Sequence, residues 1–285
     1  MPLISVIVPF LNEELYIERC IRSLLAQDFD KDQYELIFID NGSTDRSAEI
    51  VRGFPGIIFM KEEKRSSYAA RNKGLGVAKG EIVAFTDADC IIQPDWLTQI
   101  YAGMKSTGVD IVIGRRLFPS ESSGALKLFE EYENCKIEYV LNNYSKEYFF
   151  GFTNNMAVKT SVFKNIEPFQ EIIRGGDTDF IHRYMFQNQN VKIAYLPHME
   201  IIHLEILNLK KWFNRLSNYG VSNKKLMKIS DYRPLDNSRR IQILLYCIRK
   251  NKYGLIQIIN LCFLLIVGYI YFELGEIYGK IHFKR

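Results

Sequence analysis

Short β-branched apolar runs alternate with stretches of helical periodicity along the first two thirds of the chain. The apolar runs at residues 4–10, 34–40, 56–61, 81–89 and 110–114 predict buried strands. Helical spacing predicts helices at 13–27, 68–78 and 94–105, the first of them capped by Asn12. Strands that alternate with helices favour an α/β fold, in which helices cover both faces of a mostly parallel, Rossmann-like sheet.

Further along, the pattern predicts a helix at 126–141 and a strand or loop at 149–159. A helix ending near residue 187 follows, then strand-like runs at 191–196 and 199–203 and a helix at 209–219. These elements extend the predicted sheet and its helical cover.

Acidic residues stand where two of the predicted strands end. Asp40 closes the second strand, while Asp87 and Asp89 lie one residue apart at the end of the fourth. The carboxyl ends of strands in an open α/β sheet are where ligands bind. Two close carboxylates repel unless a cation lies between them, and Mg²⁺ or Mn²⁺ suits such oxygen ligands. We therefore expect a metal held against a diphosphate; helix-capping acids are the alternative.

Two more candidates lie beyond residue 170. The segment 174–179 reads Arg-Gly-Gly-Asp-Thr-Asp, and its paired glycines allow a backbone to approach a ligand closely. Asp177 is either a base or an ordinary helix N-cap. His203 lies in an apolar run, where a single histidine is either a core residue with satisfied hydrogen bonds or a ligand.

Composition narrows the class of protein. Of 285 residues, 47% are hydrophobic and 25% are charged, as in a globular protein. The five cysteines are scattered, which argues against a zinc site or a disulfide framework and fits a reducing compartment. No basic segment precedes the first apolar run, so we expect no signal peptide.

The net charge of +4 conceals an uneven distribution. Residues 205–285 hold 15 Lys and Arg against 5 Asp and Glu, a balance of +10, which leaves −6 for the rest of the chain. Basic residues beside apolar runs indicate an anionic membrane surface rather than nucleic acid. The run 255–272 is as long as the roughly 17–25 residues that a membrane span needs. A spanning or re-entrant anchor, an interfacial helix, and a buried helix of a core or dimer remain alternatives.

Five ordered segments carry a resemblance to a known family. They are Val-Ile-Val-Pro-Phe-Leu-Asn-Glu-Glu (6–14), Ile-Asp-Asn-Gly-Ser-Thr-Asp (39–45), Ala-Arg-Asn-Lys-Gly (70–74), Thr-Asp-Ala-Asp (86–89) and Gly-Asp-Thr-Asp (176–179). In this order they resemble the motifs of family 2 glycosyltransferases, which are inverting enzymes with the GT-A nucleotide-binding fold. The resemblance covers residues 4–203 and, more weakly, extends to 220. We therefore expect a catalytic domain at 1–220 and a basic, apolar, membrane-associated helical region at 221–285.

The resemblance implies transfer of a sugar from a nucleotide-diphosphate sugar to an acceptor hydroxyl on a glycan or a lipid-linked molecule. The basic, apolar C-terminal region, whether it spans the membrane or lies on it, indicates an enzyme at the cytoplasmic face of the cell membrane, and its charge pattern indicates no nucleic-acid partner. Asp177 would be the catalytic base, and Arg71 would lie near the phosphates unless it is a helix-surface arginine. The metal, Mn²⁺ or Mg²⁺, would be held by Asp89 with Asp87 and His203. The nucleotide would contact Pro9, Phe10, Asn12, Glu13, Asp40 and Asp87.

Two departures from the family pattern keep other functions open. Asn41 stands where a second Asp is usual, and Gly176 stands where Glu often precedes the catalytic Asp. A non-catalytic, membrane-associated nucleotide-sugar binding protein is therefore one alternative. A nucleotidyltransferase is another, although it would usually carry a Gly-rich basic loop after its first strand, and residues 9–13 are not such a loop.

Overall fold

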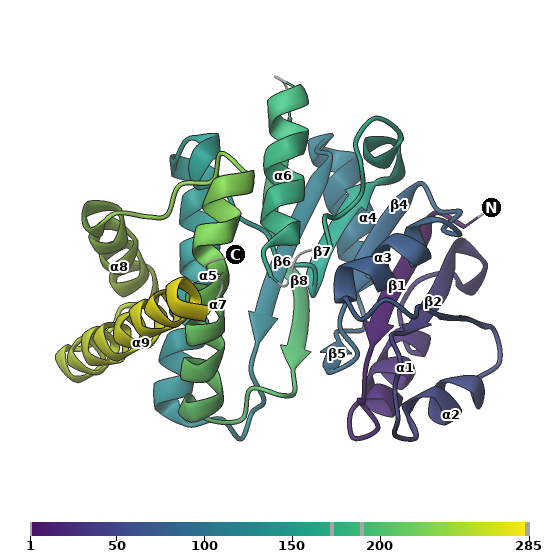
Figure 1. Ribbon diagram of the computed structural model, residues 1–285, viewed down its shortest axis with the longest axis horizontal. Coiled ribbons are helices and arrows are strands. Elements are labelled where there is room, and N and C mark those ends of the chain that lie inside the picture. The colour runs from purple at the N-terminus through teal and green to yellow at the C-terminus, as the bar shows by residue number, and fades with distance from the viewer. Residues whose placement is uncertain (1, 172–173, 189–190, 283–285) are drawn as a thin grey trace. The chain divides into compact units, whose positions relative to one another are not determined.

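The computed structural model describes residues 2–171, 174–188 and 191–282 and divides into two compact units (Figure 1). The first unit comprises Met1–Leu117 and Gly151–Leu204, and the second comprises Phe118–Phe150 and Glu205–Arg285. The two units are defined by how compactly their residues pack. They do not test the expected boundary between a catalytic domain and a membrane-associated region at residue 220, which stays a prediction.

A mixed sheet forms the centre of the first unit. In the described part of the chain its strand order is β3-β2-β1-β4-β7-β6-β8-β5. The strands are β1 (Ile4–Phe10), β2 (Tyr34–Asp40), β3 (Ile57–Lys61), β4 (Ile82–Thr86), β5 (Cys90–Ile92), β6 (Ile111–Leu117), β7 (Asn155–Lys159) and β8 (Ile193–His203). The first four in this order pair in parallel, as do β6 and β8, whereas β7 and β5 are antiparallel to their neighbours. The predicted α/β fold with a mostly parallel sheet is confirmed.

Helical periodicity explains how the sheet is covered. The helices of this unit are α1 (Ile17–Leu25), α2 (Ser47–Arg52), α3 (Ser67–Leu75), α4 (Trp96–Thr107) and α6 (Gly176–Gln187), with short 3₁₀ turns at Lys31–Gln33 and Thr160–Lys164. In α1 the buried residues Ile17, Cys20, Ile21 and Leu24 follow the spacing of one helix face. All seven residues of β1 are buried, as expected for a strand that is covered on both faces.

The structure departs from the local predictions at three places. The first helix begins at Ile17 rather than at residue 13, and Asn12 adopts a left-handed φ of 57° instead of capping it. The short strand β5 was not predicted. The runs 191–196 and 199–203 form one strand, β8, whose pairing with β6 is irregular at Gly114/Arg115.

Strand register brings the predicted acids to one edge of the sheet. Asp40 pairs with Phe10 at the end of β1, and Ile7 pairs with Phe85 near the end of β4. Because these three strands are parallel neighbours, the residues that follow them emerge at the same edge, as Figure 1 shows. Asp40 and the Asp87–Asp89 segment therefore share one face of the unit.

The second unit is helical. It contains α5 (Gly124–Asn143), α7 (Leu209–Ile229), α8 (Asn237–Asn251) and α9 (Leu255–His282), with a 3₁₀ turn at Lys146–Tyr148. Its core includes Phe129, whose ring lies 5.9 Å from that of Trp212 and 5.8 Å from that of Phe213. The helix predicted at 209–219 continues to Ile229. Among the described residues, α9 is the one helix long and apolar enough to cross a membrane.

Candidate functional site

Two loops at the carboxyl edge of the sheet are joined by reciprocal hydrogen bonds. The Asn12 side chain accepts a hydrogen bond of 2.8 Å from the backbone N–H of Thr44. In return, the backbone N–H of Glu13 donates to Ser47 Oγ at 2.7 Å. The loops after β1 and β2 therefore form one connected structure beside Asp40.

Asp40 is buried, with 3% of its surface exposed, and one carboxylate oxygen accepts a 2.8 Å hydrogen bond from Ser43 N–H. The next residue explains a departure from the family pattern. The Asn41 amide donates to the backbone carbonyls of Glu62 and Lys64 at 3.1 and 2.7 Å. A carboxylate has no hydrogen to donate and would face two carbonyl oxygens at this position. Asparagine therefore suits this turn better than aspartate.

Pro9 and Phe10 end β1 and are both buried. The Phe10 ring lies 6.5 Å from the Phe38 ring and 6.4 Å from the Phe59 ring, inside the core of the first unit. Its backbone carbonyl accepts a hydrogen bond from Asn41 N–H. Phe10 thus supports the loops through packing and its backbone.

Arg71 lies inside the structure, not on its surface. Its side chain is 4% exposed and donates a 2.5 Å hydrogen bond to Asp87 Oδ1, whereas the Asp87 side chain is 28% exposed. It also donates to the backbone carbonyl of Ser67 and lies over the Tyr68 ring. The alternative of a helix-surface arginine is therefore wrong, and the guanidinium is held rigidly beside a metal-ligand candidate.

The rest of the 70–74 segment fixes α3 in place. Asn72 exchanges two hydrogen bonds with the backbone of Phe169, at 2.8 and 3.0 Å. A Cβ at Gly74 would lie 2.8 Å from Ile7 and 2.9 Å from Ile39, so glycine permits close packing of the helix on the sheet. Sequence reasoning did not single out Asn72; its place directly after Arg71 was the available signal.

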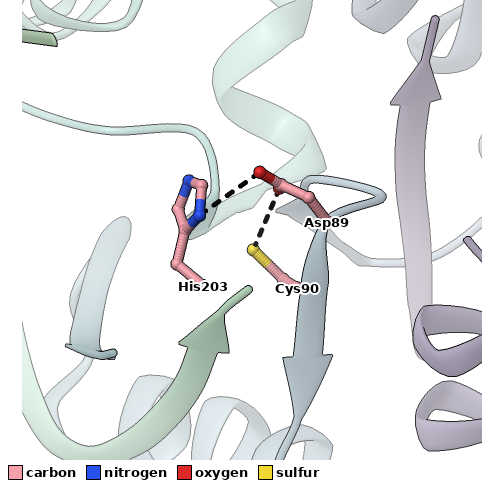
Figure 2. Close-up of side chains that lie close together, drawn as sticks. All are labelled: Asp89, Cys90 and His203. Atoms are coloured by element: carbon pink, nitrogen blue, oxygen red, sulfur yellow. Dashed lines mark hydrogen bonds and ion pairs between the residues drawn. The ribbon is translucent and has the colours of Figure 1, made fainter. Parts of the chain in front are cut away.

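Asp89, Cys90 and His203 place their side chains together (Figure 2). His203 Nδ1 lies 3.2 Å from Asp89 Oδ2, and Cys90 Sγ lies 3.6 Å from Asp89 Oδ1. Pairing of β5 with β8 sets this arrangement, because Cys90 is directly opposite His203. Potential ligand atoms of the three residues lie within 4.8 Å of one another, so they fit a bound cation. Burial, followed by the nearby aspartates, raises the pKa of Cys90 well above its usual value.

Asp177 lies in the first turn of α6, and its side chain is held by two backbone donors. Oδ1 accepts from Thr178 N–H at 2.9 Å and Oδ2 accepts from Thr153 N–H at 3.2 Å. Burial is the largest influence on the carboxyl group and raises its pKa, although these hydrogen bonds and the charge of Arg71 act in the opposite direction. Arg71 thus links Asp177 electrostatically to Asp87.

The glycine at position 176, the second departure from the family pattern, also has a structural explanation. A Cβ at this position would lie 2.9 Å from two carbons of the Tyr68 ring and 2.9 Å from the carbonyl oxygen of Gln170. The Gly176 N–H donates to the Tyr68 hydroxyl at 3.0 Å. The space that a glutamate would need is therefore filled by the buried Tyr68.

The second aspartate of this segment has a structural contact. Asp179 is fully buried, and its Oδ2 accepts a 2.8 Å hydrogen bond from Arg183 Nε. Arg183 also donates to the carbonyls of Glu167 and Pro168. Arg183 therefore joins α6 to the preceding loop, and Asp179 holds the guanidinium in place.

Comparison with known proteins gives one matching family and several similar proteins. The family model for Glycosyl transferase family 2 matches residues 5–167. Glycosyltransferase AglE of Haloferax volcanii is 33% identical over 192 residues, which cover 64% of this chain and 61% of AglE. The chain thus spans about three fifths of the length of that relative.

A Methanococcus voltae protein is 24% identical over 253 residues, 80% of this chain and 75% of its own. It is named dolichyl N-acetyl-alpha-D-glucosaminyl phosphate 3-beta-D-2,3-diacetamido-2,3-dideoxy-beta-D-glucuronosyltransferase. The solved structure of mannosyltransferase PcManGT from Pyrobaculum calidifontis, in complex with GDP-Man and Mn²⁺, has a TM-score of 0.63 at 18% identity. It covers 98% of this chain and 87% of that one, and the likeness confirms the predicted GT-A fold.

Proposed function

Because this chain belongs to glycosyl transferase family 2, we propose that it transfers a sugar from a nucleotide-diphosphate sugar to an acceptor hydroxyl, with inversion at the anomeric carbon. One observation carries the proposal. A single sheet edge gathers a buried carboxylate at Asp40, the Arg71–Asp87 pair and the Asp89–His203 pair. Together these offer polar contacts for a nucleoside, a cation for phosphate charge and ligands for a metal.

The donor would lie along this edge. Asp40 and the joined loops at Asn12 and Glu13 supply acceptors and backbone groups for the nucleoside. Arg71 supplies a planar cation suited to phosphate oxygens, and its contacts with Asp87 and Ser67 keep the guanidinium from swinging away. Binding would therefore need little rearrangement of this side chain.

Asp89 and His203 would hold a divalent metal, with Asp87 nearby. Carboxylate oxygens suit Mg²⁺ and Mn²⁺, while an imidazole nitrogen suits transition metals, so the mixed ligand set favours Mn²⁺. When bound, such a cation offsets the negative charge that develops on the leaving diphosphate. The relative solved with Mn²⁺ is consistent with this choice.

Asp177 would take the proton from the acceptor hydroxyl. Its two backbone donors fix the carboxylate, and its raised pKa makes it a stronger base than an ordinary exposed aspartate. A general base of this kind contributes about 10²–10⁴-fold to a rate. The residue sits in α6, whereas Asp89 directly precedes β5 and His203 ends β8, so the base and the metal ligands come from different elements.

The test replaces Asp177 by Asn, which keeps the size of the side chain but removes its basicity. We expect donor binding to persist and transfer to fall by about 10²–10⁴-fold. Asp32→Asn, an exposed position in a 3₁₀ turn, is the matched control and should transfer normally. Transfer at the wild-type rate by Asp177→Asn would remove this residue from the mechanism.

Donor class and metal dependence are tested together by thermal shift with UDP, GDP and dTDP, with and without Mn²⁺. Stabilisation by one nucleotide that requires Mn²⁺ and disappears in Asp89→Ala is the expected result. A folded protein that none of the three nucleotides stabilises would favour the non-catalytic alternative. Detectable hydrolysis of a donor would exclude that alternative.

We further propose a glycan or lipid-linked acceptor at the cytoplasmic face of the cell membrane. The long apolar helix α9 and the positive balance of residues 205–285 support a membrane location. The relative from Methanococcus voltae, whose name describes a dolichyl-linked acceptor, supports the acceptor class. Transfer to a lipid extract, measured against a water-soluble glycan fraction, distinguishes the two acceptors.

A further inference from the structure

Helix α9 exposes one continuous apolar stripe along its length. Its residues recur every three or four positions, which places them on one side of a helix. Six of them are between 51% and 76% exposed: Ile256, Ile259, Phe263, Ile266, Ile270 and Leu274. The stripe continues to Ile281 near the end of the helix, which is 65% exposed. A patch this long differs from the scattered apolar residues that are normal on a protein surface.

The opposite side of α9 is occupied by its own unit. A Cβ at Gly220 of α7 would lie 2.0 Å from the Phe272 carbonyl oxygen, and a Cβ at Gly275 would lie 2.0 Å from that of Ser217. Glycines at these positions therefore allow the two helix backbones to touch. Leu261, which lies on the same side as Gly275, is fully buried. Figure 1 shows α7 and α9 together in this unit.

Polar contacts on the attached side of α9 count against an upright span. Asn223 of α7 donates a 2.6 Å hydrogen bond to Glu276, and the Arg240 guanidinium of α8 lies 4.8 Å from the centre of the Tyr269 ring. A span through the middle of α9 would carry these groups into hydrocarbon, where charged side chains are costly.

Charge indicates which surface the stripe meets. Residues 205–285 carry a balance of +10. Arg249 is exposed in the last turn of α8, and Lys252 is exposed between α8 and α9. Lys280 lies near its other end. Basic residues beside an embedded apolar face are attracted to anionic lipid headgroups. The same charge opposes close approach of a second copy of this unit.

We infer that α9 lies in the plane of an anionic membrane, with its apolar stripe in one leaflet and its glycine side on α7. The helix anchors the chain to the surface without crossing the bilayer. This mode of attachment is independent of the proposed sugar transfer and can be tested on protein that is inactive.

The first test measures sedimentation of the full chain with vesicles of phosphatidylglycerol and of phosphatidylcholine. We expect tighter binding to phosphatidylglycerol, weakened by salt, and about tenfold or greater loss of binding in the double variant Phe263→Glu, Ile270→Glu. Phe186→Glu makes the same change at a residue of α6 that is 82% exposed, and it should bind normally. Thermal unfolding of the free variants shows that each remains folded.

The second test measures depth. Ile256, Ile266 and Ile277 are replaced one at a time by cysteine in a Cys262→Ser background, in which the remaining cysteines are buried. Each new cysteine is labelled with bimane, and quenching by lipid-attached groups at known depths reports the depth of the label. Equal, shallow depths at the three positions support an in-plane helix. A middle position near the bilayer centre, with the outer two near opposite surfaces, would overturn it in favour of a span.

Two other outcomes also overturn the inference. One is wild-type protein that stays in the supernatant with phosphatidylglycerol vesicles. The other is a lipid-free dimer in sedimentation velocity that the double stripe variant abolishes, which would assign the stripe to a second copy of the chain.

Discussion

Breaking the ion pair between Arg71 and Asp87 should destabilise the protein by different amounts from its two sides. The Arg71 side chain is 4% exposed, whereas that of Asp87 is 28% exposed. Asp87→Ala leaves a guanidinium buried without its carboxylate, and loss of one partner of a buried pair costs about 3–5 kcal/mol. Because Asp87 is partly hydrated, we expect the loss of stability in Asp87→Ala to lie near the lower end of this range, at about 3 kcal/mol.

Arg71→Met removes the charge from the buried side instead. The remaining carboxylate of Asp87 can bind water, so the cost should be about 1–2 kcal/mol. At roughly 2–4 °C per kcal/mol, Asp87→Ala should lower Tm by about 6–12 °C and Arg71→Met by about 2–8 °C. The double variant should lose less stability than the sum of the two single losses, because both changes remove the same interaction.

The assay is thermal unfolding in EDTA, so that a metal bound near Asp87 does not contribute. Glu18→Ala is the matched control, because Glu18 and Arg22 form a pair of similar length, 2.6 Å, that is 51% and 67% exposed. Exposed pairs contribute about 0–1 kcal/mol, so the control should change Tm little. Equal losses from the two sides of the Arg71 pair, or a larger loss in Arg71→Met, would refute the argument from burial.

Three other predictions concern the base and the glycines. Because the pKa of Asp177 is raised, the carboxylate is protonated, and so inactivated as a base, at a higher pH than an ordinary aspartate. As the pH is lowered, kcat should therefore begin to fall above the pH range in which ordinary aspartates titrate. A kcat that stays constant down to that range would contradict this role. Gly176→Glu, which restores the usual family residue, should lower Tm and transfer because of the Tyr68 ring, and Tyr68→Ala should partly rescue its Tm; a gain in transfer would count against this packing argument. Gly275→Ala should lower Tm more than Gly124→Ala, whose Cβ meets nothing within 4 Å; equal effects would show that α7 and α9 do not need their close contact.

Elements built from local patterns were predicted well from the sequence. The strands at 4–10 and 34–40 have the bounds of β1 and β2, because β-branched apolar runs between turn residues leave few other structures open. The placement of Asp40 and Asp87 at one edge then follows from parallel pairing alone. This part of the candidate site needed no information beyond strand order.

Contacts between segments far apart in the sequence could not be predicted from such local patterns. The Asp89–His203 pair depends on β5, a strand of three residues whose signal is too short to separate from a loop. Asn12 has a good capping side chain, yet the N–H of Thr44 takes that oxygen instead, which moves the helix start to Ile17. Burial of Arg71 likewise depends on its distant partner Asp87.

The two departures from the family pattern have a common explanation in packing. At position 41 an amide is needed because two backbone carbonyls, those of Glu62 and Lys64, require a donor. At position 176 a glycine is needed because the Tyr68 ring occupies the adjacent space and its hydroxyl accepts the Gly176 N–H. Each departure therefore matches a group on another segment: two carbonyls at position 41 and the Tyr68 ring at position 176. Neither departure removes a hydrogen bond to the neighbouring carboxylate, which is Asp40 in the first case and Asp177 in the second. On this argument, substitutions at these positions reflect local packing rather than loss of the site, and Asp40 and Asp177 keep the contacts their proposed roles require.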